Sequence, residues 1–337
     1  MTGLMKNRSR IAVVIPCYKV RQHIMDVIAG IGPEVHTIYI VDDCCPDNSG
    51  DFVLEHNSDN RVTILKHSIN KGVGGAVITG YLAALKDNQD IIIKLDGDGQ
   101  MDARLIPDFI SPLLSGTADY TKGNRFFYLE SLKGMPKIRL FGNAILSFMT
   151  KLSSGYWHLF DPTNGYTAIH RNALSHLPLE KISNRYFFET DMLFRLNTVQ
   201  AIVLDIPMDA KYGDEVSNLK ISQVALEFLQ KNIVNMSKRI FYNYYLRDMS
   251  IASFELPFGI LMLFVGIAFG ISHWVHSLIT NIFTSAGTVM LAGLPIIIGS
   301  QLILSFISYD IASTPNRRTR GKITFRQTSQ ENKVLKP

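Results

Sequence analysis

The decapeptide Ile91-Ile92-Ile93-Lys94-Leu95-Asp96-Gly97-Asp98-Gly99-Gln100 decides the fold class of this sequence. Its first half, Ile91–Leu95, is short, apolar on both faces and rich in β-branched residues, which is typical of a buried strand in a parallel sheet. Asp96 and Asp98 then lie at the carboxyl end of that strand, where open α/β sheets bind their ligands, and the two glycines leave room beside the backbone. Two carboxylates in this arrangement favour a divalent cation that in turn holds a diphosphate.

The same motif has simpler interpretations. Asp-Gly pairs are common in plain turns, so the motif alone leaves a purely structural role open. A calcium-binding EF-hand loop that starts at Asp96 needs Gly at its sixth position and Glu at its twelfth, and the sequence has Met101 and Pro107 there. The EF-hand interpretation is therefore excluded, and the rest of the chain decides between the other two.

The composition indicates a soluble domain joined to a small membrane part. The 337 residues are 47% hydrophobic and 19% charged, and the mean hydropathy is +0.12. The net charge of +5 favours a basic collar against anionic lipid over nucleic-acid binding, since no nucleic-acid motif accompanies it. Cys17, Cys44 and Cys45 have neither zinc-site nor disulfide spacing, which indicates a reducing compartment. Residues 1–10 are polar and basic, and we expect no secretory signal there.

Strands and helices alternate along the first part of the chain. Apolar strands are predicted at Ile11–Ile15, Thr37–Val41 and Val62–Leu65, and helices at Ser49–His56 and from the Gly-rich turn Asn70–Ala76 to Leu85. This alternation predicts an α/β fold with a doubly wound, mostly parallel sheet.

Two features of this region have both a functional and a structural interpretation. The Gly-rich turn lacks the Walker spacing and does not form GxGxxG after a first strand, so it either touches a nucleotide or simply opens a helix. Asp43 follows the strand Thr37–Val41, where an acid can accept hydrogen bonds from a nucleobase or ribose, although a solvated turn residue is the alternative.

The middle of the chain is less regular. Residues 107–154 show no clear period, and they carry Gly123-Asn124-Arg125 and the basic residues Lys133, Lys137 and Arg139. Tyr186–Leu196 has a helical period, with Phe188, Met192 and Leu196 on one side. Glu189 and Asp191 at its start are helix-terminus acids or site residues. A strand is predicted at Ala201–Ile206, and the polar loop Lys211–Lys220 either closes over a diphosphate or is a plain linker.

The last third of the chain predicts a membrane part. Ile221–Met249 mixes apolar and basic residues, as in one or two amphipathic helices at a bilayer surface. Leu256–Trp274 and Gly287–Tyr309 are each close to the roughly 20 residues that a spanning helix needs. Basic residues flank the two spans, and residues 272–286 between them contain none, so both termini are predicted to be cytoplasmic. These flanking residues are Lys238, Arg239 and Arg247 before the first span, and Arg317, Arg318, Arg320 and Lys322 after the second.

These patterns predict four segments. They are a cytoplasmic catalytic domain at residues 1–220, amphipathic interface helices at 221–250, a two-helix transmembrane hairpin at 251–312 and a polar basic tail at 313–337. The protein is expected in the cell inner membrane or another membrane that faces the cytoplasm.

Taken in order, the motifs resemble those of glycosyltransferases of the GT-A fold. Within these, the chain resembles the polyprenyl-phosphate glycosyltransferases, which include dolichol-phosphate mannose synthase and bacterial undecaprenyl-phosphate sugar transferases. The resemblance covers nearly the whole chain. Its motifs are Ile15-Pro16-Cys17-Tyr18, Val41-Asp42-Asp43, Asn70–Ala76, Leu95–Gln100, Gly123-Asn124-Arg125, Gly165 with Arg171, and Tyr212–Ser217, followed by the two spans.

The resemblance implies a role for each matching residue. Pro16, Tyr18, Asp43 and Lys71 would bind the donor nucleotide, and Asp96, Asp98 and Gln100 would ligate Mg²⁺ or Mn²⁺ on its diphosphate. Arg125, Arg171 and Lys211 would contact the phosphates of donor and acceptor. The chain departs from the family at Cys44-Cys45, where small residues are usual. It also departs at Asn218-Leu219-Lys220, because relatives place a Lys soon after the Ser that corresponds to Ser217. Lys211 is therefore preferred over Lys220 as the loop cation.

The implied reaction moves a sugar from a UDP- or GDP-sugar to a polyprenyl phosphate, with inversion at the anomeric carbon. The metal and the cations would offset charge on the leaving nucleoside diphosphate. A phosphate acceptor is already anionic and needs little help from a general base, so Glu189 and Asp191 are only secondary candidates. Other expected partners are membrane lipid and a second copy of the chain; nucleic acid is not expected.

Two rival functions differ in class. A processive synthase of the same fold would carry Gln-x-x-Arg-Trp, but neither Trp157 nor Trp274 follows an arginine. A catalytically idle membrane partner that binds a nucleotide-sugar would not need Asp96 and Asp98, and the Asp98→Ala variant separates it from an enzyme, because only an enzyme would lose metal-dependent donor hydrolysis.

Overall fold

Seven strands form one sheet, in the order β3-β2-β1-β4-β6-β5-β7, in the computed structural model, which describes residues 9–127, 137–209 and 221–316. β6 runs antiparallel to both of its neighbours, whereas every other pair in the sheet is parallel. The carboxyl ends of six strands and the amino end of β6 therefore lie at one edge. The strands are β1 (Ile11–Cys17), β2 (Thr37–Asp42), β3 (Val62–Lys66), β4 (Ile91–Lys94), β5 (Tyr120–Asn124), β6 (Thr167–His170) and β7 (Val203–Pro207).

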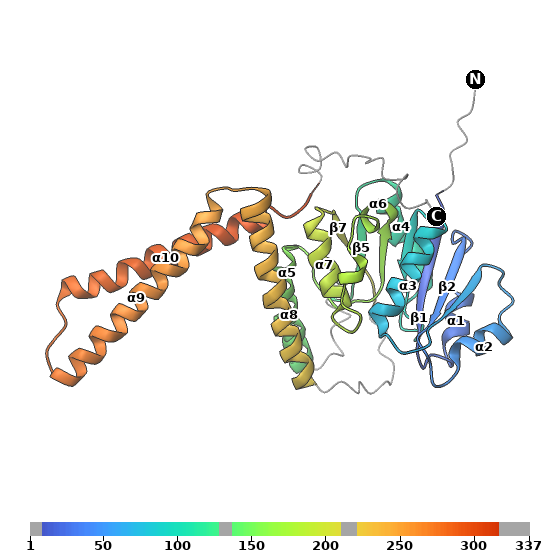
Figure 1. The fold of residues 1–337 in the computed structure, drawn as a ribbon, viewed down its shortest axis with the longest axis horizontal. Coiled ribbons are helices and arrows are strands. Elements are labelled where there is room, and N and C mark those ends of the chain that lie inside the picture. Colours follow the sequence, from blue (N-terminus) through green and yellow to red (C-terminus); the bar gives the residue numbers. More distant parts are fainter. Residues whose placement is uncertain (1–8, 128–136, 210–220, 317–337) are drawn as a thin grey trace, which may run out of the picture.

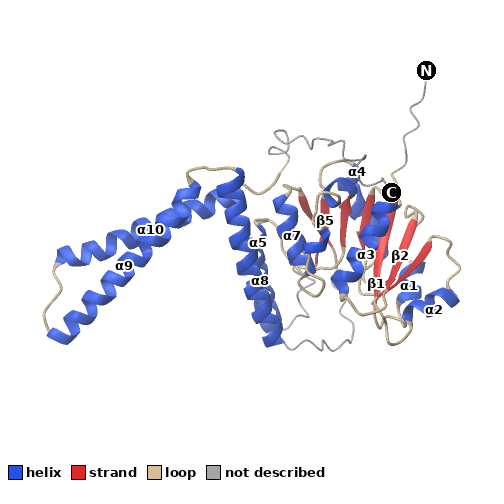
Figure 2. Ribbon diagram, viewed as in Figure 1, coloured by secondary structure: helices blue, strands red, loops and turns tan. Residues whose placement is uncertain are grey.

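Helices cover both faces of this sheet, which confirms the predicted doubly wound α/β architecture (Figures 1 and 2). Alternate residues of the apolar strands serve the two faces: Ile91 and Ile93 pack in one core with α1 and α4, and Ile92 packs in the other with α3 and α7. The helices are α1 (Ile24–Ala29), α2 (Ser49–His56), α3 (Val73–Lys86), α4 (Ile106–Leu114), α5 (Lys137–Ser154), α6 (Arg171–Leu174), α7 (Phe188–Thr198), α8 (Ile221–Phe241), α9 (Ala252–Thr280) and α10 (Ala286–Ala312).

The prediction of an irregular region over residues 107–154 was wrong. This region holds α4, β5 and α5. β5 does not read as a strand because its sequence, Tyr-Thr-Lys-Gly-Asn, is polar, yet all five of its residues are buried. The helical period of Tyr186–Leu196 was read correctly, since Phe188, Met192 and Leu196 are fully buried on α7.

α5 and α8 lie side by side at the end of the sheet that carries β7 (Figure 1). The face of α8 that turns towards α5 and α7 is largely polar: Ser153 donates to Asn232, and Asn235 donates to Asp191 of α7 at 3.0 Å. The main partner of α8 is thus α5, from much earlier in the chain, and α8 is followed directly by a short π-helix, Tyr242–Arg247. Both helices leave large apolar side chains exposed, namely Phe141, Ile145, Phe148, Leu226, Leu229 and Ile233.

α9 and α10 form an antiparallel hairpin that projects from the α/β domain (Figure 1). Both are long and apolar enough to cross a membrane, and only 11% of the most apolar window of each is buried, which distinguishes them from core helices. Glycines let the two backbones approach closely: a Cβ on Gly299 would lie 2.8 Å from the carbonyl oxygen of Gly259.

This close packing gives a testable prediction. Gly299→Leu is expected to force the two helices apart and to lower the melting temperature of the detergent-solubilised protein, because its side chain would meet the backbone of α9. Gly293→Leu in the same helix is the matched control, since a Cβ there meets nothing within 4 Å. Equal effects of the two substitutions would contradict close packing at Gly299.

A buried ion pair joins the hairpin to α8, and a hydrogen bond joins it to Trp157 of the α/β domain. Asp310, in the last turn of α10, accepts from Nη1 and Nη2 of Arg239 at 2.6 and 3.0 Å, from Tyr244 Oη at 2.6 Å and from Trp157 Nε1 at 2.8 Å. Arg239 is only 2% exposed. Its predicted place in a lipid-facing basic collar was therefore wrong, because its charge is used inside the protein.

Candidate active site

The carboxyl edge of β4 holds the two aspartates that the sequence singled out. Lys94 is the last residue of β4, and its Nζ lies 2.8 Å from Asp96 Oδ1. Gly165 closes the other side of this group: its carbonyl oxygen accepts from Lys94 Nζ at 3.1 Å, and any side chain at position 165 would collide with Asp96 and Lys94. The glycine is required here because the backbone passes directly against the carboxylate.

Glu189 reaches the same lysine from α7. Its Oε1 lies 3.1 Å from Lys94 Nζ, so that one ammonium group serves two carboxylates and a carbonyl oxygen. Burial alone would lower the pKa of Lys94, but the charges of Asp96 and Glu189 outweigh it and raise that pKa. Burial raises the pKa of Glu189, and the attraction of Lys94 opposes this rise. α7 therefore fixes its first turn to the tip of β4 through a charged contact.

Asp98 and Gln100 lie in the turn that follows. Asp98 Oδ1 accepts from the backbone nitrogen of Gln100 at 3.0 Å, and the side chain of Asp96 is 28% exposed. The donor set fits Mg²⁺ or Mn²⁺, since both prefer carboxylate oxygens. Among the described residues, no three His, Cys, Asp or Glu side chains converge into a cation site. Gln100, a diphosphate and water would therefore have to supply the remaining ligands.

Asp43 directly follows β2, as predicted, and its carboxylate is buried. Its side chain is 3% exposed, and its two oxygens accept from the backbone nitrogens of Lys71 and Gly72 at 2.8 and 2.7 Å and approach His67 Nδ1 at 2.7 Å. The carboxylate thus pins the Gly-rich turn to the end of β2. Its oxygens are thus bound inside the protein, and its predicted contact with a nucleobase or ribose stays a prediction.

The other predicted nucleotide ligands lie at the same edge of the sheet. Pro16 stands in β1 opposite Val41 of β2, and Tyr18 follows β1 with 45% of its surface exposed. Lys71 is also exposed, at the start of the Gly-rich turn. All three remain candidates for the donor nucleotide.

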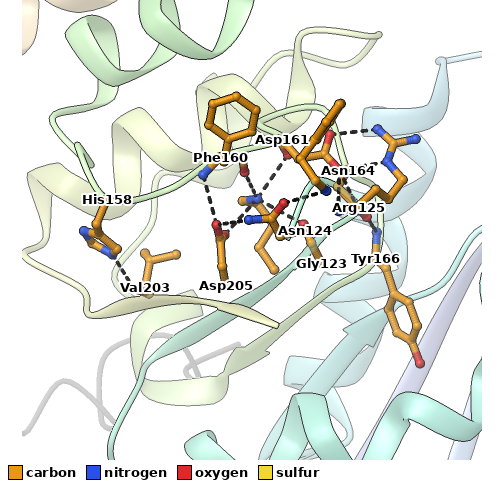
Figure 3. A network of polar contacts seen from close by, with 12 residues as sticks. Gly123, Asn124, Arg125, His158, Phe160, Asp161, Asn164, Tyr166, Val203 and Asp205 are labelled. Atoms are coloured by element: carbon orange, nitrogen blue, oxygen red, sulfur yellow. Dashed lines mark hydrogen bonds and ion pairs between the residues drawn. The ribbon is translucent and has the colours of Figure 1, made fainter. Parts of the chain in front are cut away.

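Arg125 lies at the end of β5, inside a polar network (Figure 3). Its Nε and Nη2 each donate to Asp161 at 2.8 Å, and its backbone nitrogen donates to the same carboxylate at 3.1 Å. The buried Lys122 binds the carbonyl oxygens of Phe160 and Asp161 and lies 3.0 Å from Asp205 Oδ1. Burial would raise the pKa of Asp161, but the hydrogen bonds and charge of Arg125 outweigh it and lower that pKa. The network holds the guanidinium of Arg125, which is 29% exposed, at the site edge.

The Arg125–Asp161 pair gives a second prediction. Asp161→Asn is expected to lower the free energy of unfolding by about 3 kcal/mol at neutral pH, as for other broken buried pairs. Since the folded-state pKa of Asp161 is depressed, its contribution is present above the unfolded pKa and is lost as pH falls through the folded value. The difference between wild type and variant should therefore shrink below about pH 4 in urea titrations.

A matched control tests the same kind of contact at the surface. Lys66→Gln breaks the exposed pair with Asp51, and it should leave the midpoint of the urea titration unchanged. A difference between wild type and Asp161→Asn that stays constant down to strongly acidic pH would contradict the charge-based explanation.

Two predicted site residues, Arg171 and Asp191, do not gather with the others. Arg171 lies at the opposite edge of the sheet, because β6 runs antiparallel to β4 and Arg171 follows its far end; it donates to the carbonyl oxygen of Leu85. The predicted phosphate contact of Arg171 was therefore wrong. Asp191 points away from Lys94, towards the backbone nitrogen of Ser183, Arg195 and Asn235. Lys211 and the rest of the predicted closing loop lie outside the described residues.

Sequence reasoning missed Lys94, Asp161 and His67. A signal existed for Lys94, since a lone charge within the apolar strand Ile91–Leu95 must find a buried partner. Asp161 and His67 had no comparable signal, because their partners come from distant parts of the chain.

The comparisons with known proteins agree with this geometry. The family model for glycosyl transferase family 2 matches residues 12–177. The UDP-N-acetylglucosamine–dolichyl-phosphate N-acetylglucosaminyltransferase of Methanococcus voltae is 30% identical over 218 residues, which are 60% of this chain and 86% of the relative. The chain belongs to glycosyl transferase family 2.

A second relative and a solved structure are also similar to this chain. The undecaprenyl-phosphate mannosyltransferase of Micrococcus luteus is 26% identical over 203 residues, or 59% of this chain and 82% of the relative. Glucosyl-3-phosphoglycerate synthase from Mycobacterium tuberculosis, solved with Mn²⁺, UDP-glucose and phosphoglyceric acid, superimposes with a TM-score of 0.50 at 18% identity. The superposition covers 68% of this chain and 79% of that chain, and it shows that the two share the GT-A fold.

Proposed function

We propose that this family 2 glycosyltransferase moves a sugar from a UDP- or GDP-sugar to a polyprenyl phosphate at a membrane surface, with inversion at the anomeric carbon. The carboxylate pair Asp96 and Asp98 at the carboxyl edge of β4 carries the proposal, because it offers oxygen ligands at the edge of the sheet where open α/β folds bind their ligands. When bound there, Mg²⁺ or Mn²⁺ would neutralise charge that develops on the leaving nucleoside diphosphate. Relatives with dolichyl phosphate and undecaprenyl phosphate in their names support the acceptor class.

The chain's own residues favour a phosphate acceptor over a hydroxyl acceptor. A hydroxyl nucleophile needs a general base within hydrogen-bond reach. Glu189 is buried against Lys94, and Asp191 is bound by Ser183, Arg195 and Asn235. Neither carboxylate is placed to take a proton from an acceptor, whereas an anionic phosphate oxygen needs only orientation. Arg125, held by Asp161 at the same edge, is the described cation that we assign to that task.

α7 links this site to the membrane part. Its Glu189 contacts Lys94 beside Asp96, and two residues later Asp191 accepts from Asn235 of α8. The first turn of α7 thus contacts both the candidate site and α8. The exposed apolar side chains of α5 and α8 suit the surface of a bilayer.

The decisive experiment offers UDP- and GDP-sugars, with Mg²⁺ or Mn²⁺, together with undecaprenyl phosphate or a shorter polyprenyl phosphate. The expected product is a polyprenyl-phosphate monosaccharide, identified by its mass. A sugar found on protein or on a free growing glycan, with none on the lipid phosphate, would overturn the proposal and favour a different branch of the family.

We also propose that the catalytic domain and both termini face the cytoplasm, as the basic residues around the spans predict. Cys44 is exposed, whereas Cys17 and Cys45 are buried. An impermeant maleimide is therefore expected to label Cys44 in inverted membrane vesicles but not in intact cells. In a Cys44→Ser background, Asn281→Cys between α9 and α10 should show the reverse pattern; labelling of Cys44 in intact cells would contradict this orientation.

A further inference from the structure

Lys94 is a fully buried cation next to a residue that we assign to cation binding. Its Nζ has three acceptors, Asp96 Oδ1 at 2.8 Å, Glu189 Oε1 at 3.1 Å and the Gly165 carbonyl oxygen at 3.1 Å, which match the three protons of an ammonium group. The side chain is 1% exposed. The ammonium group cannot turn away into solvent, so Asp96 is permanently paired.

This pairing has a consequence for any second cation. A carboxylate that already binds an ammonium group attracts another cation less strongly, and the two positive charges on either side of the carboxylate repel each other. Asp96 retains Oδ2, and Asp98 has one oxygen bound to the backbone of Gln100. Besides the neutral amide of Gln100, the protein alone therefore offers a weak pair of ligands, in agreement with the lack of a third His, Cys, Asp or Glu ligand among the described residues.

We propose that Lys94 is a built-in competitor for the metal, which keeps cation binding weak until a nucleoside diphosphate brings its own charge and oxygen ligands. The inference rests on the proposed function, since it deepens the role of the carboxylate pair. Glu189 is its second component: by sharing the ammonium group it reduces the hold of Lys94 on Asp96. Binding of cation and of nucleotide would thus be reciprocally coupled, each strengthening the other by the same factor.

The test measures Mn²⁺ binding rather than turnover. Free Mn²⁺ is followed by electron paramagnetic resonance while the detergent-solubilised full chain is titrated, alone and with saturating UDP or GDP. The double variant Lys94→Met/Glu189→Gln removes the ammonium group together with a carboxylate that it neutralises, so that it strands no buried charge. Without nucleotide, it is expected to bind Mn²⁺ about tenfold more tightly than wild type, a factor within the usual range of coupling between two binding sites. Added nucleotide should then increase its Mn²⁺ affinity by a smaller factor than in wild type.

Glu189→Gln alone should act in the opposite direction. Without the charge of Glu189, the ammonium group of Lys94 binds Asp96 more strongly, so Mn²⁺ binding without nucleotide should weaken severalfold. Lys122→Met/Asp205→Asn is the matched control, because it removes another buried Lys–Asp pair, which joins the middle of β5 to the middle of β7 instead of reaching Asp96. This double variant should leave the Mn²⁺ affinity without nucleotide unchanged.

The outcomes separate the two proposals. If wild type gains Mn²⁺ affinity from nucleotide but the double variant binds Mn²⁺ no more tightly without it, or if Glu189→Gln tightens binding, the competitor role of Lys94 is overturned and the proposed function stands. If wild type takes up no Mn²⁺ with either nucleotide present, the metal-assisted function itself is overturned, and the inference with it.

Discussion

Replacing Asp98 with alanine is expected to lower the rate of sugar transfer by about a hundredfold to a thousandfold, the loss found when one group that stabilises transition-state charge is removed. Asp98 stands in the turn after β4, and it is one of two carboxylates assigned to the cation on the diphosphate. Without it, the charge that develops on the leaving group would be poorly neutralised. The measurement is product formation at saturating donor and acceptor.

The control for this variant is Asp108→Asn. Asp108 is an exposed acid in the first turn of α4, close in sequence but on an element that covers one face of the sheet. It should retain wild-type activity. Retention of activity within about threefold by Asp98→Ala, a change too small for a lost charge-stabilising ligand, would leave no role for the carboxylate pair in catalysis.

The second large effect is expected at the base of the hairpin. Asp310→Leu should lower the free energy of unfolding by about 3–5 kcal/mol, because it leaves the guanidinium of Arg239 buried without its partner. The Tyr244 hydroxyl and the Trp157 indole would lose their acceptor as well. Thermal unfolding in detergent, read by circular dichroism, measures the loss.

Two further variants test whether charge or shape is responsible. Asp310→Leu combined with Arg239→Met removes both charges, and it should restore a large part of the lost stability. Lys231→Met breaks the exposed pair with Glu227, and it should change stability by less than about 1 kcal/mol. If the double variant is no more stable than Asp310→Leu, packing rather than charge would hold the hairpin in place.

Strongly patterned segments were predictable from the sequence. β4, β1 and α2 were placed to within two residues, because apolar runs and cap residues are local signals. The two spans were located for the same reason, although α9 and α10 extend beyond the predicted limits at both ends. β5 was missed because its buried Lys122 is neutralised by Asp205, a residue about eighty positions away.

The candidate site was predicted in part. Asp96, Asp98 and Arg125 are brought to one edge because they follow strands that run in the same direction. Arg171 was misplaced because nothing in Thr167–His170 reveals that this strand runs antiparallel to β4. The internal use of Asp43 by the Gly-rich turn is likewise a tertiary effect, since its partners lie more than twenty residues away.

The contact between Trp157 and Asp310 joins residues 153 positions apart. During synthesis, the ribosome must finish the second membrane helix before the indole and the guanidinium of Arg239 can meet their common acceptor. The sheet can form earlier, since its strands end at Pro207. We therefore expect the α/β domain to fold first and the contacts that dock α10 onto it to form last.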